Sequence, residues 1–146
     1  MKKVFFLTAI MMCFITIGCN KDDVDTTASK KDLLTAGSWK LTAVVSDDDG
    51  DGTYETNDFI NFFDCFTDNY YIFKTNGELE MNEGTTKCDP ADPQTDIGSW
   101  ELTNNETTLI IGNIDTYLIE DLNTSTMKLK QTFSGNRSSI VTFSKR

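Results

Sequence analysis

The side chains best suited to metal chemistry lie in one acidic stretch, residues 47–58. Oxygen donors recur there at alternate positions and Gly52 stands sixth, a spacing that fits the twelve-residue calcium loop. In such a loop, alternate side chains converge on a hard cation that needs six or more oxygens. The predicted ligands are Asp47, Asp49, Asp51, Thr53, Glu55 and Asp58.

Two interpretations of this stretch stay open. One is a calcium site with a dissociation constant of about 0.1–1 mM, as in extracellular modules, which would stabilise the fold by mass action. The other is a solvated Asp/Gly hairpin without an ion. It is favoured by the short Asp58 at the twelfth position and by the lack of flanking amphipathic helices. Calcium is the one cofactor that the sequence suggests, and no organic cofactor is expected.

The N-terminal residues have the composition of an export signal. Lys2 and Lys3 precede an apolar stretch, residues 4–17, that is shorter than the roughly 18–20 residues of a membrane-spanning helix. It ends in Ile15-Thr16-Ile17-Gly18-Cys19, which resembles the lipobox of bacterial lipoproteins. The resemblance implies cleavage before Cys19 and diacylglycerol on its thiol. The alternative is an ordinary secretory signal followed by a chance cysteine.

These features predict three segments: a lipoprotein signal peptide (residues 1–18), a flexible polar tether (19–31) and one folded domain (32–146). Lys21-Asp22-Asp23 is similar to the acidic export signal of some surface-exposed Gram-negative lipoproteins, and a solvated charge run is an equal alternative. The predicted location is therefore the outer membrane, with exposure on the cell surface left open.

The charge of the chain excludes some classes of partner. Its net charge is −10 and it has no histidine, so nucleic acid is not an expected partner and membrane attachment would come through the lipid anchor. Without histidine, a carboxylate pair would be the natural acid–base device, and no pair stands out by motif. No catalytic residue is assigned, and the protein is not expected to be an enzyme.

The remaining cysteines predict a disulfide. Cys13 leaves with the signal peptide and Cys19 carries the lipid, so an exported domain retains Cys65 and Cys88, which are expected to join. Two thiols without histidine complete neither a zinc shell nor an activated nucleophile. In the chain-entropy model, the bond contributes roughly 3–3.5 kcal/mol to the free energy of unfolding.

Two similar segments predict two β-strands. Gly37-Ser38-Trp39-Lys40-Leu41-Thr42 recurs with one change as Gly98-Ser99-Trp100-Glu101-Leu102-Thr103. Each segment starts a run that alternates apolar and polar residues, which is typical of a half-buried strand. Trp39 and Trp100 are expected to close the floor of a barrel. In the first strand, Leu41, Ala43 and Val45 are expected to share the inner face with Trp39.

Turn signals divide the rest of the folded domain. Residues 32–37 predict one helical turn that ends at Gly37, and residues 59–63 fit either a helical turn or an edge strand. Asn76-Gly77 is a strong hairpin signal. The predicted strands begin at residue 38 and then cover residues 70–74, 78–81, 98–103, 107–111, 114–121, 126–133 and 138–144. Eight short antiparallel strands joined mostly by tight turns indicate an all-β, up-and-down barrel or a sandwich.

A family resemblance supports the barrel. Gly37-Ser38-Trp39 after a helical turn matches the Gly-x-Trp signature of lipocalins. The acidic loop, Asp64-Cys65 with Asp68, Asn76-Gly77, Cys88 and the second Gly-x-Trp complete a pattern that resembles the lipocalin-like domain of Gram-negative bacterial lipoproteins. The resemblance implies an eight-stranded barrel of mostly unassigned role. Arg137 is the candidate for the basic residue that stacks on the first-strand Trp in lipocalins.

Two functions remain. The favoured one is a non-enzymatic structural or interaction module with a surface protein partner, its barrel plugged by its own side chains. The alternative is a carrier that holds a small hydrophobic ligand in the barrel. The bulky residues expected to point inward are Trp39, Leu41, Tyr71, Phe73, Leu79, Met81, Trp100, Leu102, Met127, Leu129 and Phe133.

The lipidation hypothesis predicts an outcome for Cys19→Ala. Cells that express the wild-type chain should incorporate a radioactive fatty acid into the protein, and the variant should incorporate none, because the acceptor thiol is gone. Cys13→Ala is the control and should keep the label. Absence of label in the wild type, or label that survives Cys19→Ala, contradicts the lipid anchor.

Overall fold

The computed structural model describes residues 28–62 and 64–146. The predicted signal peptide, Cys19 and most of the tether lie outside these residues. The described helices and strands are α1 (Lys30–Thr35), β1 (Ser38–Asp47), β2 (Thr56–Asn57), η1 (Asp58–Asn61), α2 (Asp64–Thr67), β3 (Tyr70–Phe73), β4 (Glu78–Asn82), β5 (Thr95–Thr103), β6 (Thr108–Ile111), β7 (Asp115–Leu122), β8 (Thr126–Thr132), η2 (Ser134–Asn136) and β9 (Ser138–Lys145). No helix among them is both long and apolar enough to cross a membrane.

Eight of the described strands form a closed antiparallel barrel. They are hydrogen-bonded in the order β1-β3-β4-β5-β6-β7-β8-β9, and β9 pairs with β1 to close the ring. Apart from the short strand β2, neighbours in the chain are neighbours in the sheet, which is the up-and-down connection that the turn signals predict. The predicted fold class is therefore confirmed.

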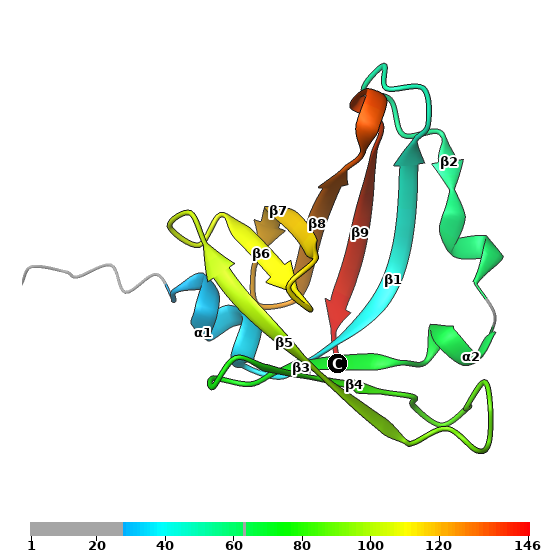
Figure 1. Ribbon diagram of the computed structural model, residues 1–146, viewed down its shortest axis with the longest axis vertical. Coiled ribbons are helices and arrows are strands. Elements are labelled where there is room, and N and C mark those ends of the chain that lie inside the picture. Colours follow the sequence, from blue (N-terminus) through cyan, green and yellow to red (C-terminus); the bar gives the residue numbers. More distant parts are fainter. Residues whose placement is uncertain (1–27, 63) are drawn as a thin grey trace, which may run out of the picture.

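The two edges of β1 pair with their neighbouring strands over different lengths. One edge pairs with β9 from Trp39 to Asp47, whereas the other pairs with β3 through only three residues, Ser38 to Lys40. Beyond Lys40, β3, β4 and β5 diverge from β1 and β9 (Figure 1). The short β2 pairs with Val45 and Ser46 on the edge that β3 has left. The barrel is therefore tightly closed at one end and splayed at the other.

A bulge changes which residues of β1 face the interior. The register with β9 shifts between Leu41 and Ala43, and an extra residue reverses the alternation of side chains beyond it. Val44, predicted to face outward, packs against the core instead. The predicted inner face is therefore correct for Trp39 and Leu41 and wrong for Ala43 and Val45.

The other strands differ from the prediction mainly at their ends. β5 begins at Thr95, three residues before the predicted strand. Of the two alternatives left open for residues 59–63, the structure has a helical turn, the 3-10 helix η1 (Asp58–Asn61). Phe133 was predicted to point inward, but β8 ends at Thr132 and Phe133 is 47% exposed at the start of the next turn. The other ten bulky residues predicted to point inward are buried or pack against the core.

Helix α1 covers the closed end of the barrel. Ser29 caps it: the Ser29 hydroxyl accepts the backbone N–H of Asp32 at 3.0 Å, and the Asp32 carboxylate accepts the Ser29 N–H. Helix α1 therefore begins at Lys30, inside the predicted tether. Leu34 is fully buried, and its carbonyl oxygen accepts the indole N–H of Trp39 at 2.9 Å.

A lysine completes this end. Lys145 Nζ lies 4.7 Å from the centre of the Trp39 ring and donates to the carbonyl oxygen of Leu33 at 3.1 Å, and burial lowers the pKa of this lysine. Lys145, from the last strand, thus occupies the stacking position proposed for Arg137, which is exposed and bonds Ser134. Helix α1 ends at its C-cap residue Ala36, immediately before Gly37, which does not have a positive φ. Gly37 leaves room for the Lys145 side chain, since a Cβ atom there would lie 2.9 Å from Cε and the lysine would have to shift.

Trp100 fills the same half of the interior from β5. Its ring lies edge-on against Phe73 with the ring centres 5.6 Å apart, and its indole N–H donates to the carbonyl oxygen of Lys74 at 3.0 Å. Trp39 is fully buried and Trp100 is 7% exposed. Both tryptophans therefore bury a large apolar surface with the indole N–H satisfied.

Trp39→Ala is expected to lower the free energy of unfolding by about 3–5 kcal/mol, because it leaves a large cavity beneath α1 and removes the ring under Lys145. Urea unfolding followed by circular dichroism measures this loss. Ile114→Ala is the control: Ile114 is 84% exposed, and its replacement should change stability by less than about 0.5 kcal/mol. A loss below about 1 kcal/mol for Trp39→Ala contradicts the structural role of this ring.

Candidate functional site

The splayed half of the barrel contains an apolar cavity of about 360 Å³, which we call the cup. Its lining comes from β1, β3, β4 and β6–β9 together with one residue of the segment between β2 and β3. Most of the lining is aliphatic or aromatic. The residues are Leu41, Val44, Phe62, Tyr71, Phe73, Leu79, Met81, Ile111, Tyr117, Leu129, Gln131, Ser139, Val141 and Phe143.

Alternation along the strands places these side chains. Tyr71 and Phe73 on β3 lie two residues apart and point to the same face, as do Leu79 and Met81 on β4. Trp39, which does not line the cup, is fully buried. In the cup wall, Leu79 is also fully buried, whereas Tyr71 and Met81 keep part of their surface exposed. The interior is therefore packed at the floor and hollow above it.

Four polar side chains interrupt the apolar wall: Tyr71, Tyr117, Gln131 and Ser139. The ring of Tyr71 is held edge-on against Phe143, with the ring centres 5.5 Å apart. Burial, and secondly the carboxylate of Glu83, raise the pKa of Tyr71 above its usual value. Burial, then Asp115 and Tyr71, raise the pKa of Tyr117 in the same way. Both phenols therefore remain neutral hydrogen-bond donors at physiological pH.

An aromatic segment borders the mouth of the cup. Phe62 follows η1 and contributes to the lining, while its ring lies 5.9 Å from Phe59 and 6.4 Å from Phe66, centre to centre. Ile60 in the same segment is 75% exposed. This segment crosses the side of the barrel where β1 and β3 have separated (Figure 1), and Phe62 is its contribution to the cup wall.

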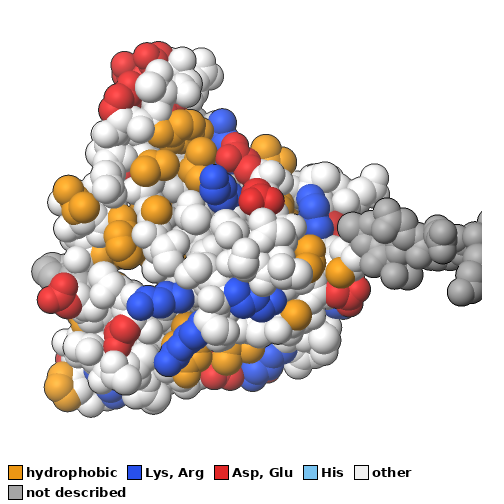
Figure 2. Space-filling view, turned by 180° about the vertical axis from the view of Figure 1, so that it is seen from behind, with side chains coloured by type: hydrophobic (Ala, Val, Ile, Leu, Met, Phe, Trp, Pro, Cys, Tyr) orange, Lys and Arg blue, Asp and Glu red, His pale blue; other side chains and the backbone are white. Residues whose placement is uncertain are grey.

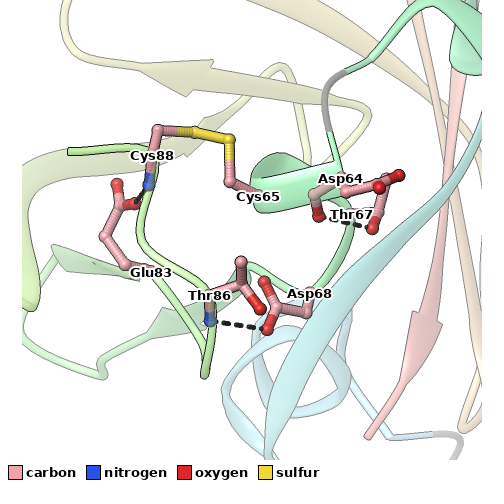
Figure 3. Close-up of a disulfide and its surroundings, with 7 residues drawn as sticks. All are labelled: Asp64, Cys65, Thr67, Asp68, Glu83, Thr86 and Cys88. Carbon is pink, nitrogen blue, oxygen red and sulfur yellow. Dashed lines mark hydrogen bonds between the residues drawn. A yellow bond between two sulfur atoms is a disulfide. The ribbon is translucent and has the colours of Figure 1, made fainter. Parts of the chain in front are cut away.

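The predicted disulfide fixes that segment. Cys65, on α2, is bonded to Cys88 in the loop between β4 and β5, as Figure 3 shows. The bond ties the segment at the mouth to the part of the sheet that diverges from β1. Because only two residues of β2 pair with the sheet here, the covalent bond replaces strand pairing as the restraint.

Asp68 adds a second restraint beside the disulfide (Figure 3). One of its carboxylate oxygens accepts the backbone N–H groups of Thr85 and Thr86, at 2.8 and 3.0 Å, and the hydroxyl of Thr85. The hydroxyl bond, opposed by partial burial, lowers the pKa of Asp68. The loop approaches so closely that only glycine fits at position 84, where a Cβ atom would lie 2.5 Å from the Asp68 carbonyl oxygen.

The acidic loop lies at the far tip of the splayed end, where Figure 2 shows acidic side chains gathered at the top of the molecule. Asp47, Asp49 and Asp51 each bring a carboxylate oxygen within 4.8 Å of the others. Asp47 is buried and accepts the backbone N–H groups of Gly50 and Gly52 at 2.7 and 3.0 Å. The first three predicted calcium ligands are therefore close together.

The later predicted ligands are arranged differently. Among the described residues, the carboxylate cluster does not include Glu55 or Asp58. Asp58 accepts a hydrogen bond from the Ser46 hydroxyl, and the backbone N–H of Thr53 donates to Asp51 at 2.7 Å. The structure thus brings together three of the six predicted ligands. Asp58 lies instead at the start of η1, where the segment at the mouth begins.

Sequence patterns anticipate part of the cup. Six of its fourteen lining residues belong to the predicted inward set, including Tyr71 and Met81. Tyr117, two residues before the buried Ile119, is marked by simple alternation on β7 but was not singled out. Val44 was missed because of the bulge. Phe62 carries no local signal, because only the tertiary fold brings it to the mouth.

Comparison with known proteins gives one family match. The family model described as "Domain of unknown function (DUF5004)" matches residues 16–145. The comparison with curated proteins finds no match. Among solved structures, the chain is similar to a lipocalin-like protein from Bacteroides uniformis ATCC 8492. The two are 19% identical over 78% of this chain and 99% of that chain, with a TM-score of 0.46.

Proposed function

The chain belongs to the DUF5004 family, a domain of unknown function, and we propose that it is a lipid-anchored binding protein of the cell envelope that holds a small apolar molecule in its cup. The observation that carries this proposal is the cup itself. Its volume of about 360 Å³ falls in the range of small-molecule pockets, and its lining is mostly apolar with a few polar groups.

The hollow interior favours binding over a purely structural role. A plugged barrel would bury its bulky side chains along its whole length, but Tyr71, Met81 and Tyr117 keep exposed surface around the cup. Burial of apolar surface stabilises a protein by about 25 cal/mol for each Å², and exposed apolar surface lacks this stabilisation. A small apolar ligand recovers this free energy, so the cup and its occupant are physically matched.

The proposal includes no catalysis. The described lining residues contain no carboxylate, thiol, amine or imidazole, and the hydroxyls of two tyrosines and one serine have no adjacent base in the cup. Binding and release of an unchanged ligand is the function that this chemistry supports.

Anchoring would keep the cup near a membrane. Residue 28, the first described residue, is nine positions after Cys19, so an extended tether reaches at most about 30 Å. A diacylglycerol anchor at Cys19 would therefore hold the barrel within one molecular diameter of the bilayer, where sparingly soluble apolar molecules are concentrated. Outer-membrane placement, on the cell surface or facing inward, is part of this proposal.

A second candidate function is an interaction module, the function that the sequence favoured. It is supported by the exposed apolar side chains beside the mouth: Ile60 is 75%, Phe66 41% and Phe62 38% exposed. Several exposed apolar residues in one segment are typical of a surface that meets a protein partner. The two functions differ in whether a small molecule occupies the cup.

A substitution that fills the cup tests the binding function. The neutral dye N-phenyl-1-naphthylamine should bind the purified protein with a rise in fluorescence. Val141→Phe should weaken this binding at least tenfold, because the larger ring occupies the cavity. Leu118→Phe is the matched control, since Leu118 lies on the outer face of β7 and is 50% exposed, and it should bind as the wild type does.

Circular dichroism melting must show that Val141→Phe is folded. If that variant unfolds, it is replaced by Ile111→Phe, at a cup residue on β6. No dye binding by the wild type, or equal binding by a folded filled variant, contradicts the cup as a ligand site. Native mass spectrometry of the protein from its own cells then identifies any apolar molecule that copurifies.

The acidic loop is proposed to bind calcium weakly and so to stiffen the splayed end. The support is the convergence of Asp47, Asp49 and Asp51. Calcium at ten times its dissociation constant should stabilise the fold by about 1.4 kcal/mol, seen as a melting temperature higher than in chelator. Asp49→Asn with Asp51→Asn should remove the difference, and Asp89→Asn, outside the loop, should not. An unchanged melting temperature in the wild type contradicts the proposal.

A further inference from the structure

The polar groups of the cup have an unusual composition. Among its fourteen lining residues, the two phenols of Tyr71 and Tyr117 are the only ionisable groups, and no lysine or arginine is present. Neither phenol has a hydrogen-bond partner in the described part of the chain, whereas the hydroxyl of Tyr54, outside the cup, lies 2.9 Å from the Ser138 hydroxyl oxygen. Both phenols are therefore free to donate to a bound molecule.

The two phenols approach the cup from different walls. Tyr71 is on β3 and Tyr117 on β7, with three strands between them in the order of the sheet. Both side chains nevertheless line the same cavity. The edge-on contact with Phe143 holds the Tyr71 ring, so this donor is positioned before any ligand arrives.

The charges around these phenols are negative. Glu83 acts on Tyr71, and Asp115 acts on Tyr117 and also accepts a hydrogen bond from Gln131 at 3.4 Å. A carboxylate or phosphate in the cup would be buried beside like charges and without a cation, which is strongly unfavourable.

Three lysines of the barrel make contacts elsewhere. Lys74 pairs with Glu78 and Glu80 on the outside of the β3–β4 hairpin. Lys145 is bound over Trp39 at the closed end, and Lys130 lies against the ring of Tyr54. None of these lysines lines the cup.

We propose that the cup selects uncharged apolar molecules that carry a hydrogen-bond acceptor, such as a ketone, ester or alcohol oxygen, and that Tyr71 and Tyr117 donate to that oxygen. Fatty acids and other anionic lipids are excluded. This specificity rests on the proposed binding function and adds to it the chemical class of the ligand.

The test compares three head groups on one eleven-carbon chain: 2-undecanone, undecanoate and undecane. Each compound displaces N-phenyl-1-naphthylamine from the full protein at pH 7.5. The ketone should bind at least tenfold more tightly than undecanoate. In Tyr71→Phe with Tyr117→Phe, the affinity for the ketone should fall about tenfold while the affinity for undecane stays the same, because only the two donors are lost.

Tyr70→Phe is the matched control. Tyr70 neighbours Tyr71 on β3 but does not line the cup; its ring lies against Arg146, and phenylalanine keeps that contact. This variant should bind all three compounds as the wild type does. Each single Tyr→Phe variant in the cup provides a second measurement should the double variant be unstable.

The outcomes separate the two proposals. If neither the dye nor any of the three compounds binds, the binding function itself is contradicted, and the specificity with it. If undecanoate binds as tightly as the ketone, the binding function stands and the selection against anions is overturned. If the ketone keeps its affinity in the folded double variant, the assignment of the two phenols as donors is overturned.

Discussion

The structure depends on how β1 divides its two edges. One edge pairs with β9 along nearly the whole strand and closes the barrel, while the other holds β3 through only three residues. Full pairing on both edges would give a uniformly narrow barrel filled by its own side chains. Short pairing on one edge lets β3, β4 and β5 diverge, and the cup is the space that this divergence leaves.

The two ends of the barrel consequently have different roles. At the closed end, α1, Trp39 and Lys145 link the first and last strands through packing, a cation over an aromatic ring and a hydrogen bond to a backbone carbonyl. Such buried contacts supply most of the stability of a small domain. The splayed end is less closely packed, so its apolar walls remain available to contact a ligand.

The segment at the mouth needs restraints of its own, because β2 is too short to hold it in the sheet. The Cys65–Cys88 bond and the carboxylate of Asp68 supply them, and both connect to the β4–β5 side of the opening. The segment at the mouth is therefore held to that side by a covalent bond and by hydrogen bonds to a carboxylate. A binding cavity keeps its shape best when its rim is held in this way.

The sequence by itself determined the strands, most of the turns and the disulfide, because alternation, Asn-Gly and cysteine counting are local or compositional signals. It also marked both tryptophans for burial. Only the tertiary structure decided that Val44 faces inward, through a bulge, and that Lys145 takes the place expected for Arg137. It also decided that the barrel is hollow at one end. These features depend on register and on strand divergence, which arise from contacts between residues far apart in the chain.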